Sequence, residues 1–452
     1  MLFLIIYIIT LFLGGFLILN TVLKIKELSD IVIFSIPVGI LINVPLYFLF
    51  DKLGLRYDRI TLFIILFLYI VIAGICLYKK KIKIINNINK VPWYFIIFTT
   101  FILSNLIIAA YTSYFNWSNW DEFSAWQIAP KLASIDNSYD TSITIAVNTP
   151  LLVVNGVLVN NICGITINYA RIFSSIFFGL LLIFMYFELV RMKVNRNLAA
   201  IVTIIFATSA PELIILSKTY YNNIFCTFYF TTGLWILAKQ FLIKYSRKDL
   251  ILSSILLVAT ILLRNEMFIF NILAYILMFI ILLIKKDKIF YKLKIPFLIT
   301  TIAYIFLNII LKPYTTFSNL SLIQSKAEII ERFSGPVLKQ FIIAIYEQMF
   351  NFSPYYIYTT VYIFVIIAVI IIFVFVKNII KKNVNIKIQM YMYIIIVQCM
   401  YIGLILATQF VRFKRFEFLV AASFSRYVLL VLPFSFLILG VLINDRHFEK
   451  KE

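Results

Sequence analysis

Residues 60–78 read ITLFIILFLYIVIAGICLY, an apolar stretch without a charged side chain. A helix needs about twenty such residues to cross the hydrocarbon core of a bilayer. The whole chain follows this pattern, because 63% of its 452 residues are hydrophobic and only 13% are charged. Soluble domains are about half apolar and about one quarter charged. The sequence therefore predicts an all-α polytopic membrane protein.

The same length rule predicts about 13 transmembrane helices. They cover residues 1–23, 31–50, 60–78, 92–113, 169–190, 198–216, 223–243, 250–265, 267–284, 295–311, 357–376, 388–410 and 428–443. The pair 250–265 and 267–284 is short and closely spaced.

Lysine and arginine gather in short clusters between these spans, for example at 79–83 and 285–288. Such clusters are typical of cytoplasmic loops facing anionic lipid. They predict an outer N-terminus and a cytoplasmic C-terminus. Attraction between these loops and anionic lipid also accounts for the net charge of +21. We therefore expect no nucleic-acid partner. The abundance of Ile, Lys and Asn is typical of an AT-rich bacterial genome, which suggests the bacterial cytoplasmic membrane.

This orientation places the segments 114–168, 312–356 and 411–427 on the outer face. The second contains two amphipathic helix-like runs, separated by the helix breaker Ser334–Pro336. We expect these runs either to lie in the membrane interface or to pack on the spans. The third is rich in basic residues, which runs against the orientation rule and suggests an anionic ligand.

An acidic pair stands out in the first outer segment, where residues 116–127 read NWSNWDEFSAWQ. Asp121 and Glu122 lie among tryptophans at the end of a span. Partial desolvation there should raise a carboxyl pKa and suit a general base acting on a hydroxyl. The alternative is a solvated loop whose tryptophans form an interfacial belt.

Arg264 and Glu266 interrupt an otherwise apolar stretch. Charges at membrane depth are costly and often mark a functional cavity. The alternative is a helix hairpin that turns at the outer surface with the two side chains paired.

Two further outer span ends carry candidate ligands. Arg426 and Tyr427 could bind a phosphate, although an arginine at a helix end often only extends to the interface. Tyr221 and Asn222 offer neutral hydrogen bonds to a sugar or acceptor.

Several enzyme classes are disfavoured. The chain has no glycine-rich phosphate loop and no Asp-x-Asp motif, its four cysteines lack metal or redox spacing, and its only histidine, His447, lies in the charged tail. An outward site has no access to cytoplasmic nucleotide sugars, so a transferase there would need a donor carried on lipid.

Taken together, these motifs resemble the GT-C superfamily of polytopic glycosyltransferases that use polyprenyl-phosphate sugars, especially the mannosyltransferase-like members that build bacterial cell-surface polysaccharide. The resemblance covers about residues 92–440. Its carriers are Trp120–Ser124, Asn148–Leu151, Tyr220–Asn223, Leu262–Glu266 and Phe424–Tyr427. Two departures are that asparagine stands at 222 and 223, where relatives often have aspartate, and that three additional spans, within residues 1–78, precede the single span that the family core has before the loop.

The resemblance implies a role for each matched residue. Asp121 would deprotonate the acceptor hydroxyl, and Glu122 would assist it or help to hold a divalent metal such as Mg or Mn. The leaving phosphate of the donor would meet Arg264, Arg426 and Tyr427. The sugar or acceptor would contact Trp120, Trp126, Tyr221, Asn222 and Glu266.

The resemblance also implies a domain plan and a reaction. Residues 1–91 would form extra N-terminal spans, 92–444 a GT-C-like core, and 445–452 a cytoplasmic tail. The reaction would be an inverting sugar transfer, on the outer face, from a polyprenyl-phosphate carrier to a glycan, lipid or protein acceptor of the cell envelope.

Two alternatives use the same features. A polysaccharide polymerase or ligase would depend on the outer arginines and not on Asp121. A flippase or transporter of lipid-linked sugars would show ionisable residues along its spans and an internal repeat, and the sequence offers few of the first and no clear second.

Overall fold

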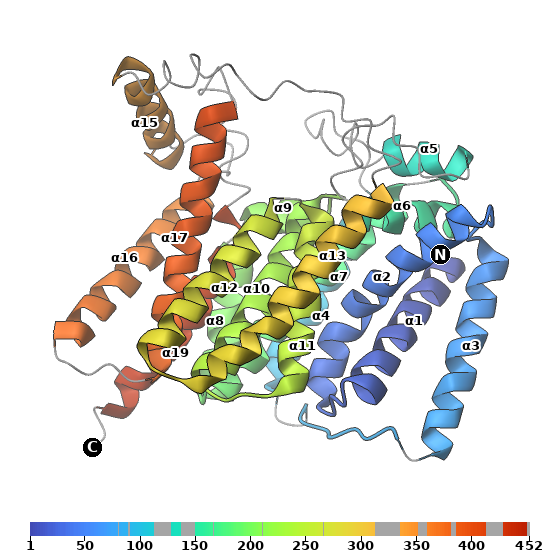
Figure 1. Cartoon of the computed structure of the whole chain (residues 1–452), viewed down its shortest axis with the longest axis horizontal. Coiled ribbons are helices and arrows are strands. Elements are labelled where there is room, and N and C mark those ends of the chain that lie inside the picture. The colour runs from blue at the N-terminus through green and yellow to red at the C-terminus, as the bar shows by residue number, and fades with distance from the viewer. Residues whose placement is uncertain are drawn as a thin grey trace.

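The computed structural model describes residues 1–79, 81–88, 91–112, 128–136, 150–165, 167–209, 211–264, 266–311, 335–350, 359–380, 386–412 and 428–449. The regular elements of this part are helices (Figure 1). One isolated β-bridge pairs Glu27 with Ile85. In a bilayer a helix satisfies its own backbone hydrogen bonds, which is why apolar sequence of this length folds this way.

The N-terminal half contains α1 (Leu2–Leu17), the π-helical turn η1 (Ile18–Val22), α2 (Leu28–Lys52), α3 (Arg59–Tyr78), α4 (Trp93–Thr112), α5 (Ile128–Asp136), α6 (Pro150–Cys163), α7 (Ile167–Arg191), α8 (Arg196–Ser209) and α9 (Pro211–Ser217). The C-terminal half contains α10 (Asn222–Leu242), α11 (Arg247–Leu263), α12 (Met267–Ile284), the 3-10 turn η4 (Lys288–Leu293), α13 (Lys294–Leu311), α15 (Gly335–Phe350), α16 (Thr359–Ile380), α17 (Ile386–Arg412) and α19 (Leu432–Glu449).

Eight helices of the described part are long and apolar enough to cross a membrane. This agrees with the predicted class of helical membrane protein. Their bounds lie close to the predicted ones, as in α3 and α12, because hydrocarbon thickness fixes the length of each apolar run. The count of 13 spans stays a prediction.

One predicted span differs from the structure. The stretch 198–216 is divided into α8, which ends at Ser209, and α9, which begins at Pro211. Proline has no backbone N–H and fits the first turn of a helix, so it starts a new helix here instead of continuing the old one.

The first outer segment, predicted as a loop over 114–168, contains two helices. α6 begins at Pro150, as the Asn-Thr-Pro motif indicates, and most of its residues are buried. The second outer segment contains α15, which begins at Gly335, within the predicted breaker. The first amphipathic run of that segment lies outside the described residues.

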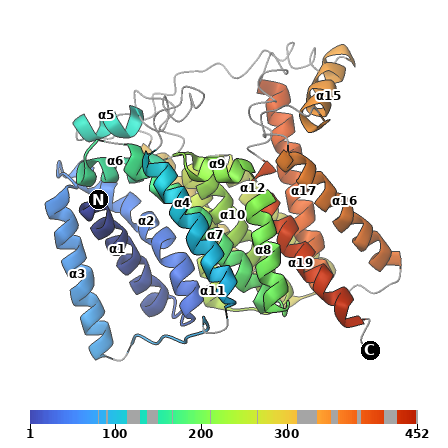
Figure 2. The same cartoon turned by 180° about the vertical axis from the view of Figure 1, so that it is seen from behind.

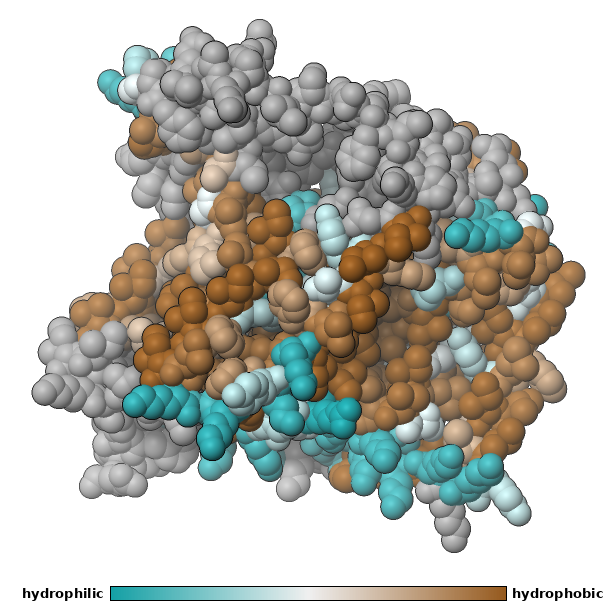
Figure 3. Space-filling view, in the orientation of Figure 1, coloured by the Kyte–Doolittle hydropathy of each residue, from teal (hydrophilic) through white to brown (hydrophobic). Residues whose placement is uncertain are grey.

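The bundle has two distinct edges (Figures 1 and 2). Lysines and arginines of the turns after η1, α3, α7, α10 and α12 form a hydrophilic band that we call the basic edge (Figure 3). At the opposite end, which we call the far edge, lie α5, α6 and α9. A continuous hydrophobic core joins the N-terminal helices to the rest, with buried members from Leu4 to Leu442.

α1 and α2 cross in direct backbone contact. A Cβ atom on Gly15 would stand 1.8 Å from the Ser35 carbonyl oxygen, and one on Gly39 would stand 2.0 Å from that of Leu11. Small residues allow this approach, which is a common way to pack helices in lipid.

We expect Gly39→Ala to lower the melting temperature of the purified protein, because its methyl group must push two backbones apart, at a cost of about 1–3 kcal/mol. Gly74→Ala is the matched control, since nothing lies within 4 Å of a Cβ atom there. Equal melting temperatures for the two variants would contradict this packing.

A buried carboxylate joins two helices, α7 and α10, near the basic edge. Glu188 of α7 is 1% exposed. Its Oε2 accepts from Lys239 Nζ at 2.6 Å and from Trp235 Nε1 at 2.9 Å, both on α10. Its Oε1 accepts from Arg191 Nη1 at 2.7 Å.

Arg191 extends this network to α2. Its Nη2 lies 2.6 Å from Glu27 Oε2 and 2.6 Å from Asp30 Oδ1, and it donates to Ser29 Oγ at 3.0 Å. The guanidinium therefore connects the buried Glu188 to the start of α2, and the ion network fixes the register of α2, α7 and α10.

Glu188→Gln should lower the melting temperature strongly, because it replaces the buried carboxylate that the half-buried Lys239 and Arg191 face with a neutral amide, at a cost of about 3–5 kcal/mol. Glu27→Gln is the control, because Glu27 is 48% exposed and exposed ion pairs contribute about 0–1 kcal/mol. If the two variants melted alike, the network would not organise the helices.

Candidate functional site

Arg264 lies at the far edge, between the end of α11 and the start of α12, and is only 7% exposed. Its Nη2 donates to Asn223 Oδ1 at 2.6 Å and to Asn222 Oδ1 at 3.3 Å. Neutral amide oxygens orient a guanidinium without cancelling its charge. The structure thus holds a buried cation in a fixed position at this edge.

The local fold explains this position. α10 and α11 are antiparallel neighbours, so the first residues of α10 and the residue after α11 meet at the same end. α11 stops because Arg264 adopts an extended backbone, although its N–H still donates to Thr260 O at 2.8 Å. Its carbonyl accepts from Met267 N at 3.0 Å, which begins α12.

A second set of buried hydrogen bonds begins at Tyr220, close in the sequence to Asn222 and Asn223, and leads towards the N-terminal helices. Tyr220, which lies just before α10, donates to Leu152 O of α6 at 2.6 Å. Asn155 of α6 donates to the Tyr220 hydroxyl at 3.3 Å and accepts from Tyr7 of α1 at 3.1 Å. Burial raises the pKa of the Tyr220 hydroxyl well above its ordinary value, so this hydroxyl stays protonated and neutral.

The connection between α2 and α3 holds α5 and α6 at the far edge. Arg59 Nε donates to Ile162 O at 2.7 Å, and Asn161 Nδ2 donates to Tyr57 O at 3.1 Å. Arg56 Nη2 reaches Ser134 O of α5 at 3.3 Å. The N-terminal spans therefore support the two helices that flank residues 137–149.

The structure brings together part of the predicted site. Arg264 and Asn222 are in contact. Tyr221, the residue before Asn222, is buried. Glu266 is exposed, whereas Arg264 points to the asparagines, so the alternative in which these two side chains merely pair at a surface turn does not describe the arrangement. The other predicted residues lie outside the described part of the chain: Trp120, Asp121, Glu122, Trp126, Arg426 and Tyr427.

Three further buried residues lie at this end, of which two belong to the Tyr220–Asn223 motif and one, Arg171, was not singled out from the sequence. Asn223 makes the shorter contact to Arg264, Tyr220 bridges to α6, and Arg171 of α7 is only 2% exposed. Arg171 carried a usable signal, because an arginine just inside a predicted span is costly unless it has a role.

Metal chemistry finds no anchor in the described residues, where no three His, Cys, Asp or Glu side chains group together. Asp121 and Glu122 are not among the residues that this statement covers. The asparagines at 222 and 223 turn their side-chain oxygens to the Arg264 guanidinium.

No protein-family model, curated protein or solved structure matches the chain. The GT-C resemblance therefore stays a prediction that rests on the motifs quoted above.

Tyr220→Phe should lower the melting temperature modestly, because it removes two buried hydrogen bonds worth about 1 kcal/mol each and leaves Leu152 O without that donor. Tyr78→Phe, at a hydroxyl on a side chain that is 89% exposed, is the control and should change nothing. An unchanged melting temperature in Tyr220→Phe would mean that the link to α6 does not stabilise the far edge.

Proposed function

We propose that this protein is a GT-C-like membrane glycosyltransferase that moves a sugar from a polyprenyl-phosphate carrier to a cell-envelope acceptor. The observation that carries the proposal is Arg264, a buried guanidinium oriented by the oxygens of Asn222 and Asn223. A guanidinium can bind a phosphate through two parallel hydrogen bonds, and it remains charged at any physiological pH.

The two edges support a working orientation. In this proposal the basic edge faces the cytoplasm, the far edge faces outward, and the 13 apolar stretches of the sequence all span the bacterial cytoplasmic membrane. Basic residues cluster at one edge (Figure 3). Arg264 is buried at the other edge, at the end of α11. Arginines that set membrane orientation lie in cytoplasmic loops, so a buried arginine at the outer edge needs another role. Binding an anionic ligand would supply that role.

The helices that precede and follow Asp121 and Glu122 in the sequence also support an active site at the far edge. α4 ends at Thr112 and α5 begins at Ile128, and both ends lie at this edge (Figure 2). Asn168 Nδ2 donates to Tyr111 O at 2.8 Å, which ties the end of α4 to the start of α7. The acidic pair is therefore carried on a segment whose described ends are both anchored at the edge of Arg264.

The proposed reaction is a single inverting displacement. Asp121 accepts the proton of the acceptor hydroxyl, and the hydroxyl oxygen forms a bond to the anomeric carbon. The bond from that carbon to the phosphate oxygen breaks, and the electron pair leaves with polyprenyl phosphate. Arg264 and Arg426 stabilise the negative charge that develops on the leaving phosphate.

The test is sugar transfer from a radiolabelled polyprenyl-phosphate sugar to membrane acceptors by the purified, reconstituted protein. Asp121→Asn should lower the rate by about 100-fold or more, because an amide cannot accept the proton. Arg264→Gln should lower it by about 100-fold through loss of charge on the leaving phosphate. Asp249→Asn, at a carboxylate in the first turn of α11 at the basic edge, is the matched control and should keep full activity.

Full transfer by Asp121→Asn would refute the proposed base. If Arg264→Gln and Arg426→Ala still abolished transfer in that case, the polymerase or ligase alternative would be favoured. Movement of the labelled lipid across the bilayer without transfer would favour the flippase.

A further inference from the structure

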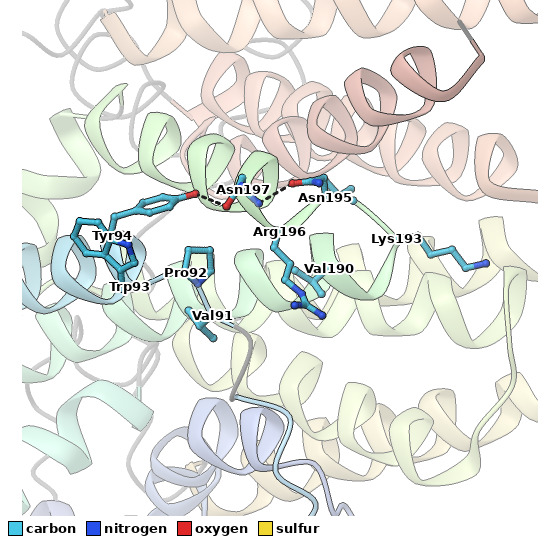
Figure 4. Close-up of a pocket in the computed structure, with 10 residues that line it drawn as sticks. Val91, Pro92, Trp93, Tyr94, Val190, Lys193, Asn195, Arg196 and Asn197 are labelled. Carbon is cyan, nitrogen blue, oxygen red and sulfur yellow. Dashed lines mark hydrogen bonds between the residues drawn. The ribbon is translucent and has the colours of Figure 1, made fainter. Parts of the chain in front are cut away.

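The basic edge contains an open pocket of about 790 Å³ that the proposed transfer reaction does not use. It lies between the start of α4 and the turn from α7 to α8 (Figure 4). Its lining combines aromatic, basic and amide side chains: Trp93, Tyr94, Lys193, Asn195, Arg196 and Asn197.

Arg196 is the group in this pocket that can recognise an anion. The side-chain oxygens of the neighbouring asparagines are already bonded, since Asn195 Oδ1 accepts from the backbone N–H of Asn197 at 2.9 Å and Asn197 Oδ1 accepts from the Tyr94 hydroxyl at 3.0 Å. In Figure 4 the Arg196 guanidinium lies beside Val190, whereas Lys193 extends away from the group. Arg196 can therefore contact a ligand directly, and Lys193 adds longer-range attraction.

An apolar surface continues from the pocket along α4. Trp93 is 72% exposed, and Ile96, Ile97 and Phe101 are also exposed on the same helix. Only 17% of the residues in the most apolar stretch of α4 are buried inside the protein. A tryptophan at the border between an apolar helix face and a charged end is typical of the level of lipid headgroups.

We propose that this pocket binds an anionic phospholipid, with the phosphate of the headgroup at Arg196 and the acyl chains along the exposed face of α4. Basic pockets beside transmembrane helices on the cytoplasmic side are suited to anionic headgroups. The continuity of charge, indole and apolar helix matches one amphiphile, whereas a soluble phosphate would leave the apolar face unused. The proposal does not depend on the glycosyltransferase function, because it concerns the opposite edge.

The test is native mass spectrometry of the full-length protein in detergent, titrated with dioleoyl phosphatidylglycerol or dioleoyl phosphatidylcholine. The first phosphatidylglycerol should bind about tenfold more tightly than the first phosphatidylcholine. Arg196→Gln should weaken phosphatidylglycerol binding by about five- to tenfold, and Arg196→Lys should retain most of the preference because it keeps the charge.

Arg247→Gln is the matched control, because Arg247 is also an exposed first residue of a helix at the basic edge. Its phosphatidylglycerol affinity should stay within about twofold of wild type. Equal losses in Arg247→Gln and Arg196→Gln would replace a specific site by diffuse attraction and overturn the proposal. So would equal affinities for the two lipids, or full competition by millimolar inorganic phosphate or glycerol phosphate, which would indicate a soluble anion.

Discussion

The carboxylate of Glu188 constrains the rest of the helix arrangement. A buried ion costs several kcal/mol unless charged and hydrogen-bonding partners surround it, and no single helix can supply all of them. Lys239 and Trp235 of α10 and Arg191 of α7 supply these partners, and Arg191 also connects to Glu27 before the start of α2. Once these helices are aligned at the basic edge, their far ends are aligned as well. Tyr229 of α10 reaches Pro37 O of α2 at 2.8 Å, and Asn222 arrives beside Arg264.

The helix bounds were predictable wherever hydrocarbon thickness alone decides them. α12 coincides with the predicted 267–284, and α3 begins one residue before the predicted 60. The break at Pro211 was missed because mean hydropathy does not register a missing backbone donor. α6 lies in the predicted outer segment 114–168, where the Asn-Thr-Pro motif at 148–150 indicates the start of a helix-like run. Other helices bury it, and that burial depends on tertiary contacts that no local pattern encodes.

Part of the candidate site was likewise predictable from the sequence, and part was not. Arg264 was identifiable because a charge in an apolar run is conspicuous, whereas its partner Asn223 is a neutral residue of a kind common at span ends. The pairing follows from the antiparallel α10 and α11, whose ends meet across more than 40 positions of sequence. The basic residues at the other edge indicated orientation but did not indicate a pocket. Arg196 becomes distinctive only when the turn after α7 is placed beside the exposed start of α4.

The backbone contact between α1 and α2 has a consequence for biogenesis. Cβ atoms on Gly15 and Gly39 would meet Ser35 and Leu11, so this helical hairpin is complete once the chain has been made as far as Lys52. Its charged anchor is complete only after Lys239 has emerged, because Glu188 needs that partner. During vectorial synthesis the hairpin can therefore enter the bilayer as a finished unit and wait for α7 and α10 to dock against it.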